Sequence, residues 1–503
     1  MHKRRTRKKQ IAIRFFTYGM MTLLAVVGVV FCLAYAMGFR IDWNDGRLTQ
    51  VALLQFSSFP TGATIDINGR ALSSTTPTRS NVKTGETTVI MSKDGYRSWR
   101  KTVDMLPSSV VWLNYARLVP NSITTDTTKN FTAVAEMRES PNKRWLILRH
   151  TDNNRHKDDT SYILAQTREE YLAMPFPLTL IDISNPKNVR FLELTIPSDK
   201  ITLPTADQAE KEKFSIIEWD QGSRFILVEH VVGEMTEYIV LDRANPGTIK
   251  NLTRDFGFNL SRPHFSGTSG NVFFGLTEVE GSGADLRKLD YGNKTASVQL
   301  AKNVQNYWLY ESGRLALVFS ENKGGQTIQN VGIYNDGSLT TVKTYSEIEE
   351  TTVLLTRFSN VDYLVVARGE SVGVYPRPLD QDAEPEPIYL QSPGGIDWIN
   401  LSPNGQFVLA GHGDQLVSFD LDTMKKYAFE VAGLRGAPQW LDNSHIVSTS
   451  GGNITFIEFD GQNREDIVSA RGRVGLSRDG KYLFSIGETA NGVILQRSQL
   501  VID

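Results

Sequence analysis

The residues that most often carry catalysis or bind metals are few in this sequence and widely spaced. Its seven histidines are His2, His150, His156, His230, His264, His412 and His445. None of them forms the H-E-x-x-H pattern, in which two histidines on one helix face bind zinc, or another close metal-ligand spacing. The sequence also lacks a G-x-S-x-G turn for a serine nucleophile and a glycine-rich phosphate loop. We therefore expect no metal site, no cofactor and no enzymatic activity.

Arginine and aromatic residues recur instead where successive predicted strands begin. These side chain types dominate the hot spots of interfaces, and aromatic faces also suit sugar rings. The set that we expect to bind a ligand or partner is Arg262, His264, Tyr307, Trp308, Asp397, Trp398, Arg435, Gln439 and Arg473. The alternative for any one of them is a solvated loop residue that binds nothing.

Composition narrows the choice of partners. The chain has 40% hydrophobic and 22% charged residues, as an ordinary globular protein has, and its formal net charge of -2 does not indicate nucleic-acid binding. Cys32 is the only cysteine, so an intrachain disulfide and a cysteine-based metal site are excluded.

The elements that would position the candidate residues are short strands in a repeated pattern. In residues 401–411 the turn Ser-Pro-Asn-Gly separates a short apolar segment from a longer apolar segment. Two predicted strands follow, in which apolar and polar residues alternate. The pattern returns at 476–487. Turn signals of this kind occur eight times, the later ones about 40 residues apart, which is the period of a four-stranded propeller blade. Residues 121–503 are therefore predicted to form an all-β propeller of seven or eight blades.

Two parts of this propeller need separate predictions. The last repeat supplies only three strands, so residues 122–131 are expected to add the fourth and close the ring. The first spacing between turns is about double the others. We assign the excess to a polar loop insertion over 150–170, with a helical turn at 167–172 and outer strands at 179–183 and 190–196. A degenerate extra blade is the alternative.

The tryptophans of the repeat fall into two classes. Trp219 and Trp440 stand just before turns, where a large aromatic side chain is expected to pack between blades. Trp308 and Trp398 lie outside that pattern, which is why they are among the expected binding residues.

The first 39 residues predict a membrane anchor. Seven lysines and arginines crowd residues 1–14, the expected cytoplasmic tail, and no charged residue occurs from Phe15 to Phe39. A helix over 15–39 would cross a hydrocarbon core of about 30 Å. The basic flank predicts a cytoplasmic N-terminus and an exported remainder. The alternative is a cleaved signal peptide, because Ala34-Tyr35-Ala36 fits the small-x-small cleavage pattern.

Residues 50–120 contain alternating strands and hairpin turns, such as the one at Asn68-Gly69. The motifs that identify a known module are Pro60-Thr61-Gly62-Ala63, Thr76-Pro77-Thr78 and Lys93-Asp94-Gly95-Tyr96. They resemble the naming motif and two loops of the PEGA domain. The resemblance implies a small β-sandwich of the kind found on bacterial surface proteins and near membrane anchors.

The repeat itself resembles the TolB-like repeat of WD40-type propellers, most plainly at 401–411, 438–442 and 476–487, although the Gly-His and Trp-Asp dipeptides of WD40 proteins do not recur. Together these features predict a single-pass, membrane-anchored binding or scaffold protein of the bacterial cell envelope. Its expected partners are the lipid bilayer, through Phe15 to Phe39, and an envelope protein or polysaccharide, with no nucleic acid. The alternative is an enzyme, a lyase or hydrolase of envelope polysaccharide, whose acids would come together from different blades.

Overall fold

The protein was analysed as a computed structural model that describes residues 7–37, 39–42, 47–150, 176–205, 208, 212–278, 283–311, 313–380, 386–392, 394–434, 436–490 and 492–502. The chain divides into two compact units. One comprises Met1–Ser122 with Val501–Asp503, and the other comprises Ile123–Leu500.

The first unit begins with α1 (Arg7–Ala36), the one helix in the described part of the chain that is long and apolar enough to cross a membrane. Its large apolar side chains are exposed all round the helix, as in a helix that meets lipid rather than a protein core. The helix starts before the predicted 15–39 span because Arg and Lys favour helix, and it ends earlier, since Phe39 already belongs to β1 (Phe39–Asp42). This helix could insert in a membrane as an anchor or act as an export signal.

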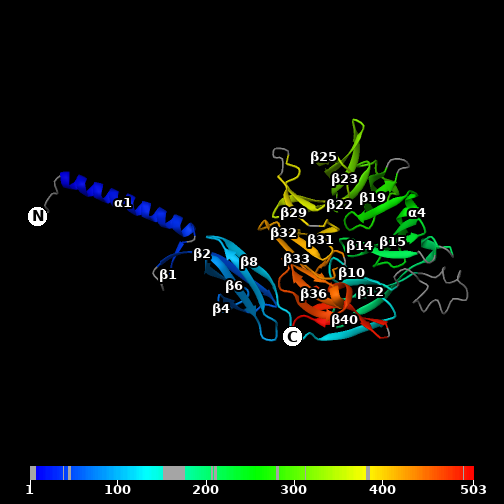
Figure 1. The fold of residues 1–503 in the computed structure, drawn as a ribbon, viewed down its shortest axis with the longest axis horizontal. Coiled ribbons are helices and arrows are strands. Elements are labelled where there is room, and N and C mark those ends of the chain that lie inside the picture. Colours follow the sequence, from blue (N-terminus) through cyan, green and yellow to red (C-terminus); the bar gives the residue numbers. More distant parts are fainter. Residues whose placement is uncertain are drawn as a thin grey trace. The chain divides into compact units, whose positions relative to one another are not determined.

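Two four-stranded sheets make up the rest of the first unit (Figure 1). In one, β2 (Arg47–Phe59) pairs with β1, with β5 (Thr78–Lys83) and, in parallel, with β8 (Val110–Arg117). The other has the order β4 (Arg70–Thr75), β3 (Thr64–Ile67), β6 (Gly85–Ser92) and β7 (Trp99–Met105). The predicted β-sandwich is confirmed.

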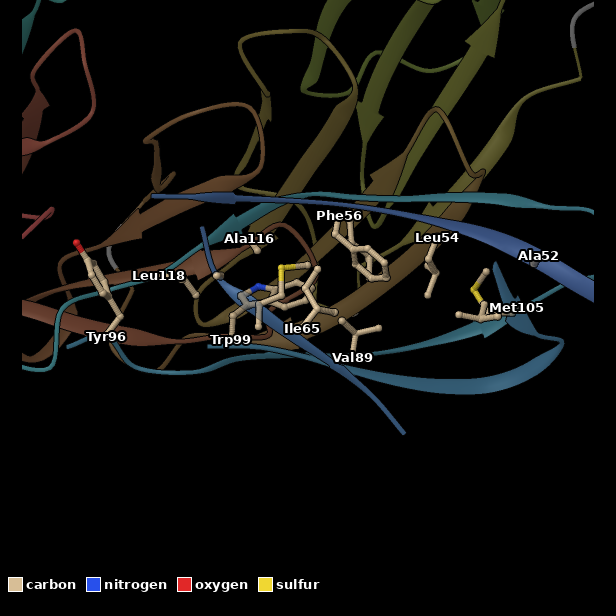
Figure 2. Packing of buried hydrophobic residues seen from close by; sticks show 14 residues of the cluster. Ala52, Leu54, Phe56, Ile65, Val89, Tyr96, Trp99, Met105, Ala116 and Leu118 are labelled. Atoms are coloured by element: carbon tan, nitrogen blue, oxygen red, sulfur yellow. The ribbon is translucent and has the colours of Figure 1, made fainter. Parts of the chain in front are cut away.

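Side chains of both sheets form the core of the sandwich. Figure 2 shows Leu54 and Phe56 of β2 opposite Ile65 and Val89 of the other sheet, and all four are almost completely buried. Leu54 and Phe56 are two residues apart, so the side-chain period of a strand places both on the inner face.

The second unit consists of eight four-stranded antiparallel sheets that follow one another along the chain, from cyan to red in Figure 1. We call them blades 1 to 8. Blade 1 contains β10 (Glu136–Glu139), β11 (Trp145–Arg149), β12 (Phe176–Asp182) and β13 (Arg190–Ile196), and blade 2 contains β14 (Lys213–Trp219), β15 (Phe225–Val232), β16 (Met235–Asp242) and β17 (Ile249–Asn251). Blade 3 contains β18 (Leu260–Phe265), β19 (Val272–Glu278), β20 (Ala284–Asp290) and β21 (Thr295–Ala296). Blade 4 contains β22 (Val304–Tyr310), β23 (Arg314–Lys323), β24 (Gln326–Asn335) and β25 (Ser338–Tyr345).

Blade 5 contains β26 (Thr351–Phe358), β27 (Val361–Arg368), β28 (Ser371–Pro376) and β29 (Ile388–Gln391), and blade 6 contains β30 (Trp398–Leu401), β31 (Phe407–His412), β32 (Gln415–Asp420) and β33 (Lys425–Glu430). Blade 7 contains β34 (Gln439–Trp440), β35 (His445–Ser448), β36 (Asn453–Glu458) and β37 (Glu465–Ser469). Blade 8 contains β38 (Arg471–Leu476), β39 (Tyr482–Thr489) and β40 (Gly492–Gln499) together with β9 (Thr125–Phe131). Short helices lie between strands at η1 (Ser198–Lys200), α4 (Leu252–Phe256) and η3 (Ser450–Gly452). The first strands of several neighbouring blades contact one another, so the first strand of each blade is its innermost strand, next to the central channel.

The ring closes through the strand that the sequence predicts for this purpose. The strand β9 pairs with β40 as the outermost strand of blade 8, and an ion pair of 2.6 Å joins Asp126 to Arg497 across the two strands. Blade 8 also packs on blade 1, where Phe484 shares a hydrophobic cluster with Leu146 and Leu148. The propeller therefore has eight blades, the larger of the two predicted numbers.

Blade 1 explains the long first spacing. The strands β11 and β12 pair directly, so the excess chain lies between two strands of one sheet rather than in an additional blade. The predicted insertion at 150–170 and its helical turn at 167–172 lie, apart from His150, outside the described residues. The outer strands predicted at 179–183 and 190–196 correspond to β12, which starts earlier, and to β13.

The turns after the innermost strands repeat the same hydrogen bonds. In the clearest copy, the Ser402 hydroxyl lies 2.8 Å from Asn404 Oδ1 and accepts the Phe407 N–H at 2.9 Å. Equivalent bonds form around Ser140 and Ser477. A serine that replaces backbone partners in this way fixes a tight turn. The recurring turn signal in the sequence thus corresponds to the same hydrogen-bond pattern in three blades.

Candidate functional site

Hydrogen bonds join the innermost strands of neighbouring blades around the whole ring. At the junctions of blades 1 to 4, the Ile216 N–H donates to Glu136 (3.1 Å), the Phe265 N–H donates to Glu218 (2.7 Å), and the Tyr307 hydroxyl donates to the Arg262 carbonyl.

The remaining junctions carry similar bonds. The Asn306 amide donates to the Thr351 carbonyl (3.3 Å), Thr356 to the Gly405 carbonyl (3.3 Å), Asn400 to the Pro438 carbonyl (3.3 Å), Gln439 to the Val474 carbonyl (2.9 Å), and the Leu476 N–H to Glu139 (2.5 Å). Each blade junction therefore has a polar link beside its apolar packing, and several candidate residues take part in these links.

Arg262, His264 and Tyr307 lie together between blades 3 and 4. Arg262 Nη1 donates to Asn306 Oδ1 at 3.2 Å, and His264 Nδ1 lies 3.0 Å from a carboxylate oxygen of Glu218. Tyr307 is buried, and this burial raises the pKa of its hydroxyl well above the ordinary value. The structure thus gives all three residues a part in holding blades together, although Arg262 and His264 keep contact with solvent.

Asp397 and Trp398 lie at the start of β30 in blade 6. Asp397 accepts the Gly413 N–H at 3.1 Å and pairs with His412 at 2.9 Å, and these two contacts lower the pKa of its carboxyl group. Trp398 is half-buried and lies over Gly411, where a β-carbon would stand 2.4 Å from the indole ring. It belongs to the packing between blades 6 and 7.

The candidates of blades 7 and 8 have different surroundings. Gln439 is half-buried and binds the backbone of Val474 with both ends of its amide. Arg435 lies outside the described residues. Trp219 and Trp440, as predicted, pack in the hydrophobic clusters between blades.

One pocket of about 380 Å³ lies where innermost strands end, and we call it the Trp308 pocket. The residues that give it its character are Gln221, Trp308, Tyr310, Arg357, Asn400 and Asn404. Gln221 follows β14 in blade 2, whereas the other residues belong to blades 4 to 6. The pocket therefore spans the end of the central channel. Trp308 is 40% exposed there, far more than Trp219, which is 8% exposed.

A second pocket, of about 370 Å³, lies where the innermost strands of blades 8 and 1 begin, and we call it the Arg473 pocket. Its polar lining comes from Glu136, His150, Arg471 and Arg473. The Arg473 side chain reaches solvent yet is surrounded by protein, and burial lowers the pKa of its guanidinium, with a further contribution from nearby Arg138. The nine candidate residues are thus distributed over several places in the ring, with Trp308 and Arg473 lining different pockets.

Sequence reasoning missed two carboxylates of β10, Glu136 and Glu139. Glu136 accepts hydrogen bonds from Arg138, Arg149 and blade 2, and Glu139 accepts one from blade 8. Burial raises the pKa of Glu139 to about 7, although Lys143 and the Leu476 N–H oppose this. The only signal in the sequence was the presence of acids on a strand that is expected to be innermost.

A fully buried titratable group of the propeller is His230 in blade 2. Its ring nitrogens lie 2.9 Å from Glu212 and 3.2 Å from Glu237, and its ring stacks on Phe214. Burial opposes protonation, but the two carboxylates outweigh it and raise the pKa of His230. Within the described ranges, no group of three or more His, Cys, Asp or Glu residues could hold a metal ion.

Comparison with known proteins identifies the domain that follows the N-terminal helix. The PEGA domain family matches residues 52–120. Curated protein sequences give no match. Among solved structures, the chain is similar to the Dos1 propeller, with 12% identity and a TM-score of 0.43 over 75% of this chain and 96% of the other. It is also similar to apo AztD from Citrobacter koseri, with 11% identity and a TM-score of 0.40 over 82% and 96%. The family match identifies a PEGA domain, the eight sheets described above form the β-propeller, and no activity follows from these similarities.

Proposed function

We propose that this chain is a membrane-anchored protein of the bacterial cell envelope that binds an envelope polysaccharide at the Trp308 pocket. In this proposal α1 stays in the membrane, the basic N-terminal tail is cytoplasmic, and the PEGA domain and propeller lie outside the cytoplasm. The seven basic residues within 1–14 support this orientation, because positive flanks of a membrane helix are retained on the cytoplasmic side.

The observation that carries the proposal is the exposed indole of Trp308 in a concave pocket with polar walls. An indole that is exposed inside a pocket can stack on a ligand, and aromatic anchors concentrate binding energy. The guanidinium of Arg357 and the amides of Asn400 and Asn404 line the pocket with polar groups, and the two amides also make hydrogen bonds within the protein. A flat apolar surface would favour a protein partner, whereas this pocket combines a ring-stacking face with polar groups, as a sugar requires.

The same lining favours binding without turnover. Hydrolysis of a glycosidic bond commonly uses two carboxyl groups on either side of it. Glu311 is the one carboxylate among the described lining residues of the Trp308 pocket. We therefore propose that the pocket holds its ligand without cleaving it.

The test compares two tryptophan variants of the full-length protein in detergent. Trp308→Ala should weaken the capture of solubilised envelope polysaccharide about tenfold or more, because an aromatic anchor is lost. Trp112→Ala is the matched control, since Trp112 is 53% exposed but belongs to the PEGA domain. Equal polysaccharide binding by wild type and Trp308→Ala would reject the site. Capture of an envelope protein that depends on Trp308, without polysaccharide, would reject the ligand class.

A further inference from the structure

We propose that the Arg473 pocket binds an oxyanion, the carboxylate or phosphate group of a small ligand, between the guanidinium groups of Arg473 and Arg471. This site does not depend on the proposed function, because the Trp308 pocket is formed by other residues, at the ends rather than the starts of innermost strands.

The central observation is that Arg473 has no partner among the residues that the structure describes. In the part of the chain that the structure describes, no hydrogen bond, ion pair or ring contact engages its guanidinium. Its neighbour Arg471 pairs with Glu488 at 3.2 Å, but both of these side chains are more than half exposed. Exposed pairs of this kind are weak and leave Arg471 available to a ligand.

Glu136 is the one carboxylate among the described lining residues of the pocket, and it is occupied elsewhere. Glu136 Oε1 accepts a hydrogen bond from Arg138 at 2.8 Å. Glu136 Oε2 lies 3.4 Å from Arg149 Nε and accepts the Ile216 N–H at 3.1 Å. Glu136 attracts Arg473 over a distance, but both of its oxygens are bound to other donors. The described lining of the pocket therefore carries more positive than negative charge.

Arg473 is also held in surroundings that disfavour its charge. Burial lowers the pKa of its guanidinium, and repulsion from Arg138 lowers it further. Moving part of a charged group out of water without a partner costs free energy, although Arg473 remains exposed and water keeps this cost small. An oxyanion in the pocket would offset that cost and the repulsion between the arginines, whereas a neutral ligand would do neither.

The residue type indicates which anion chemistry fits. The planar guanidinium presents parallel N–H groups that match the two oxygens of a carboxylate or phosphate. A pocket of about 370 Å³ has room for an acid of monosaccharide size. His150 closes one side but is itself engaged, with its nitrogens 3.3 Å from the Ala133 carbonyl and 2.7 Å from Thr179.

Calorimetric titration of the full-length protein in detergent tests the proposal, with inorganic phosphate and glucuronate as probes and glucose as the neutral control. We expect phosphate, glucuronate or both to bind and glucose not to bind. Arg473→Gln should weaken anion binding about tenfold or more, since charge-assisted hydrogen bonds are lost. Arg473→Lys should weaken it less, because it keeps the charge and loses the fork.

Arg478→Gln is the matched control, because Arg478 is an exposed arginine in the turn of the same blade. It should bind anions like wild type, and the basic N-terminal tail is identical in all variants. Binding of phosphate alone or glucuronate alone would support the site and assign its anion. No anion binding by the wild type, or equal affinity in Arg473→Gln and Arg478→Gln, would overturn the proposal. If circular dichroism shows that Arg473→Gln is misfolded, Arg471→Gln and Arg473→Lys decide by the same criterion.

Discussion

Glu139 should make the stability of the propeller depend on pH, and Glu139→Gln should remove that dependence. Glu139 links blade 1 to blade 8 by accepting the Leu476 N–H, and burial raises its pKa from 4.5 to about 7. A raised pKa means that the folded state prefers the protonated acid. The contribution of Glu139 to stability is therefore fully present below pH 4.5 and is lost as the pH rises through 7.

The size of the effect follows from the pKa difference. Between pH 4.5 and 7 the folded state loses at most about 3 kcal/mol relative to the unfolded state. The Glu139 side chain keeps some contact with solvent, so screening should make the measured value smaller. Glutamine has nearly the same shape and keeps an oxygen that can accept the Leu476 N–H, but it never becomes charged.

The assay is thermal unfolding of wild type and Glu139→Gln at a series of pH values from 4 to 8. We expect equal midpoints at pH 4 and a midpoint for the variant that is about 2 to 5 °C higher at pH 8. Other groups that titrate in this range, His230 among them, are the same in both proteins and cancel in the difference. Parallel curves over the whole range would refute the reasoning, because they would show that Glu139 does not titrate differently on folding.

Two further predictions concern ring closure and topology. Replacing Lys129 and Asn130 together with proline should lower the melting temperature of the propeller and promote association through the exposed edge of β40. These two residues pair regularly with Leu495 and Ile494, so their N–H groups point to opposite sides and one of them must lose its bond. The double alanine variant is the control, and a monomeric proline variant with unchanged melting would contradict the role of β9. A reporter enzyme that is active only outside the cytoplasm should work when fused after Asp503, and neutralising the basic residues of 1–14 should reduce or invert insertion. An inactive fusion that the cytoplasm protects from external protease would count against this orientation.

The sequence predicts features that depend on neighbours along the chain. The Ser-Pro-Asn-Gly turn at Ser402 can be predicted because its hydrogen bonds join residues that are close in the sequence. The closing strand β9 can be predicted because the last repeat supplies only three strands. Contacts between blades are different. Glu136 and Ile216 are far apart in sequence, and no periodic pattern joins them.

Trp398 is a residue whose packing contact the sequence does not predict. It does not stand directly before a turn, so the sequence suggested an accessible ring. The structure instead places it over Gly411, where the missing side chain makes room for the indole. Among the described glycines none lies against Trp308, which stays exposed. The two tryptophans can be distinguished only when the strand pairing of Trp398 with Gly411 is known, and this pairing comes from the structure.

The closing strand has a consequence for how the chain matures in time. Because β9 precedes β10 while its partner β40 ends just before the last residues, β9 is made long before the strand with which it pairs. At ordinary rates of synthesis the delay is on the order of tens of seconds. A strand edge that waits this long is open to wrong pairing with other chains. Residues 125–130 are all threonine, aspartate, lysine or asparagine. This composition keeps the waiting segment soluble until the end of the propeller emerges.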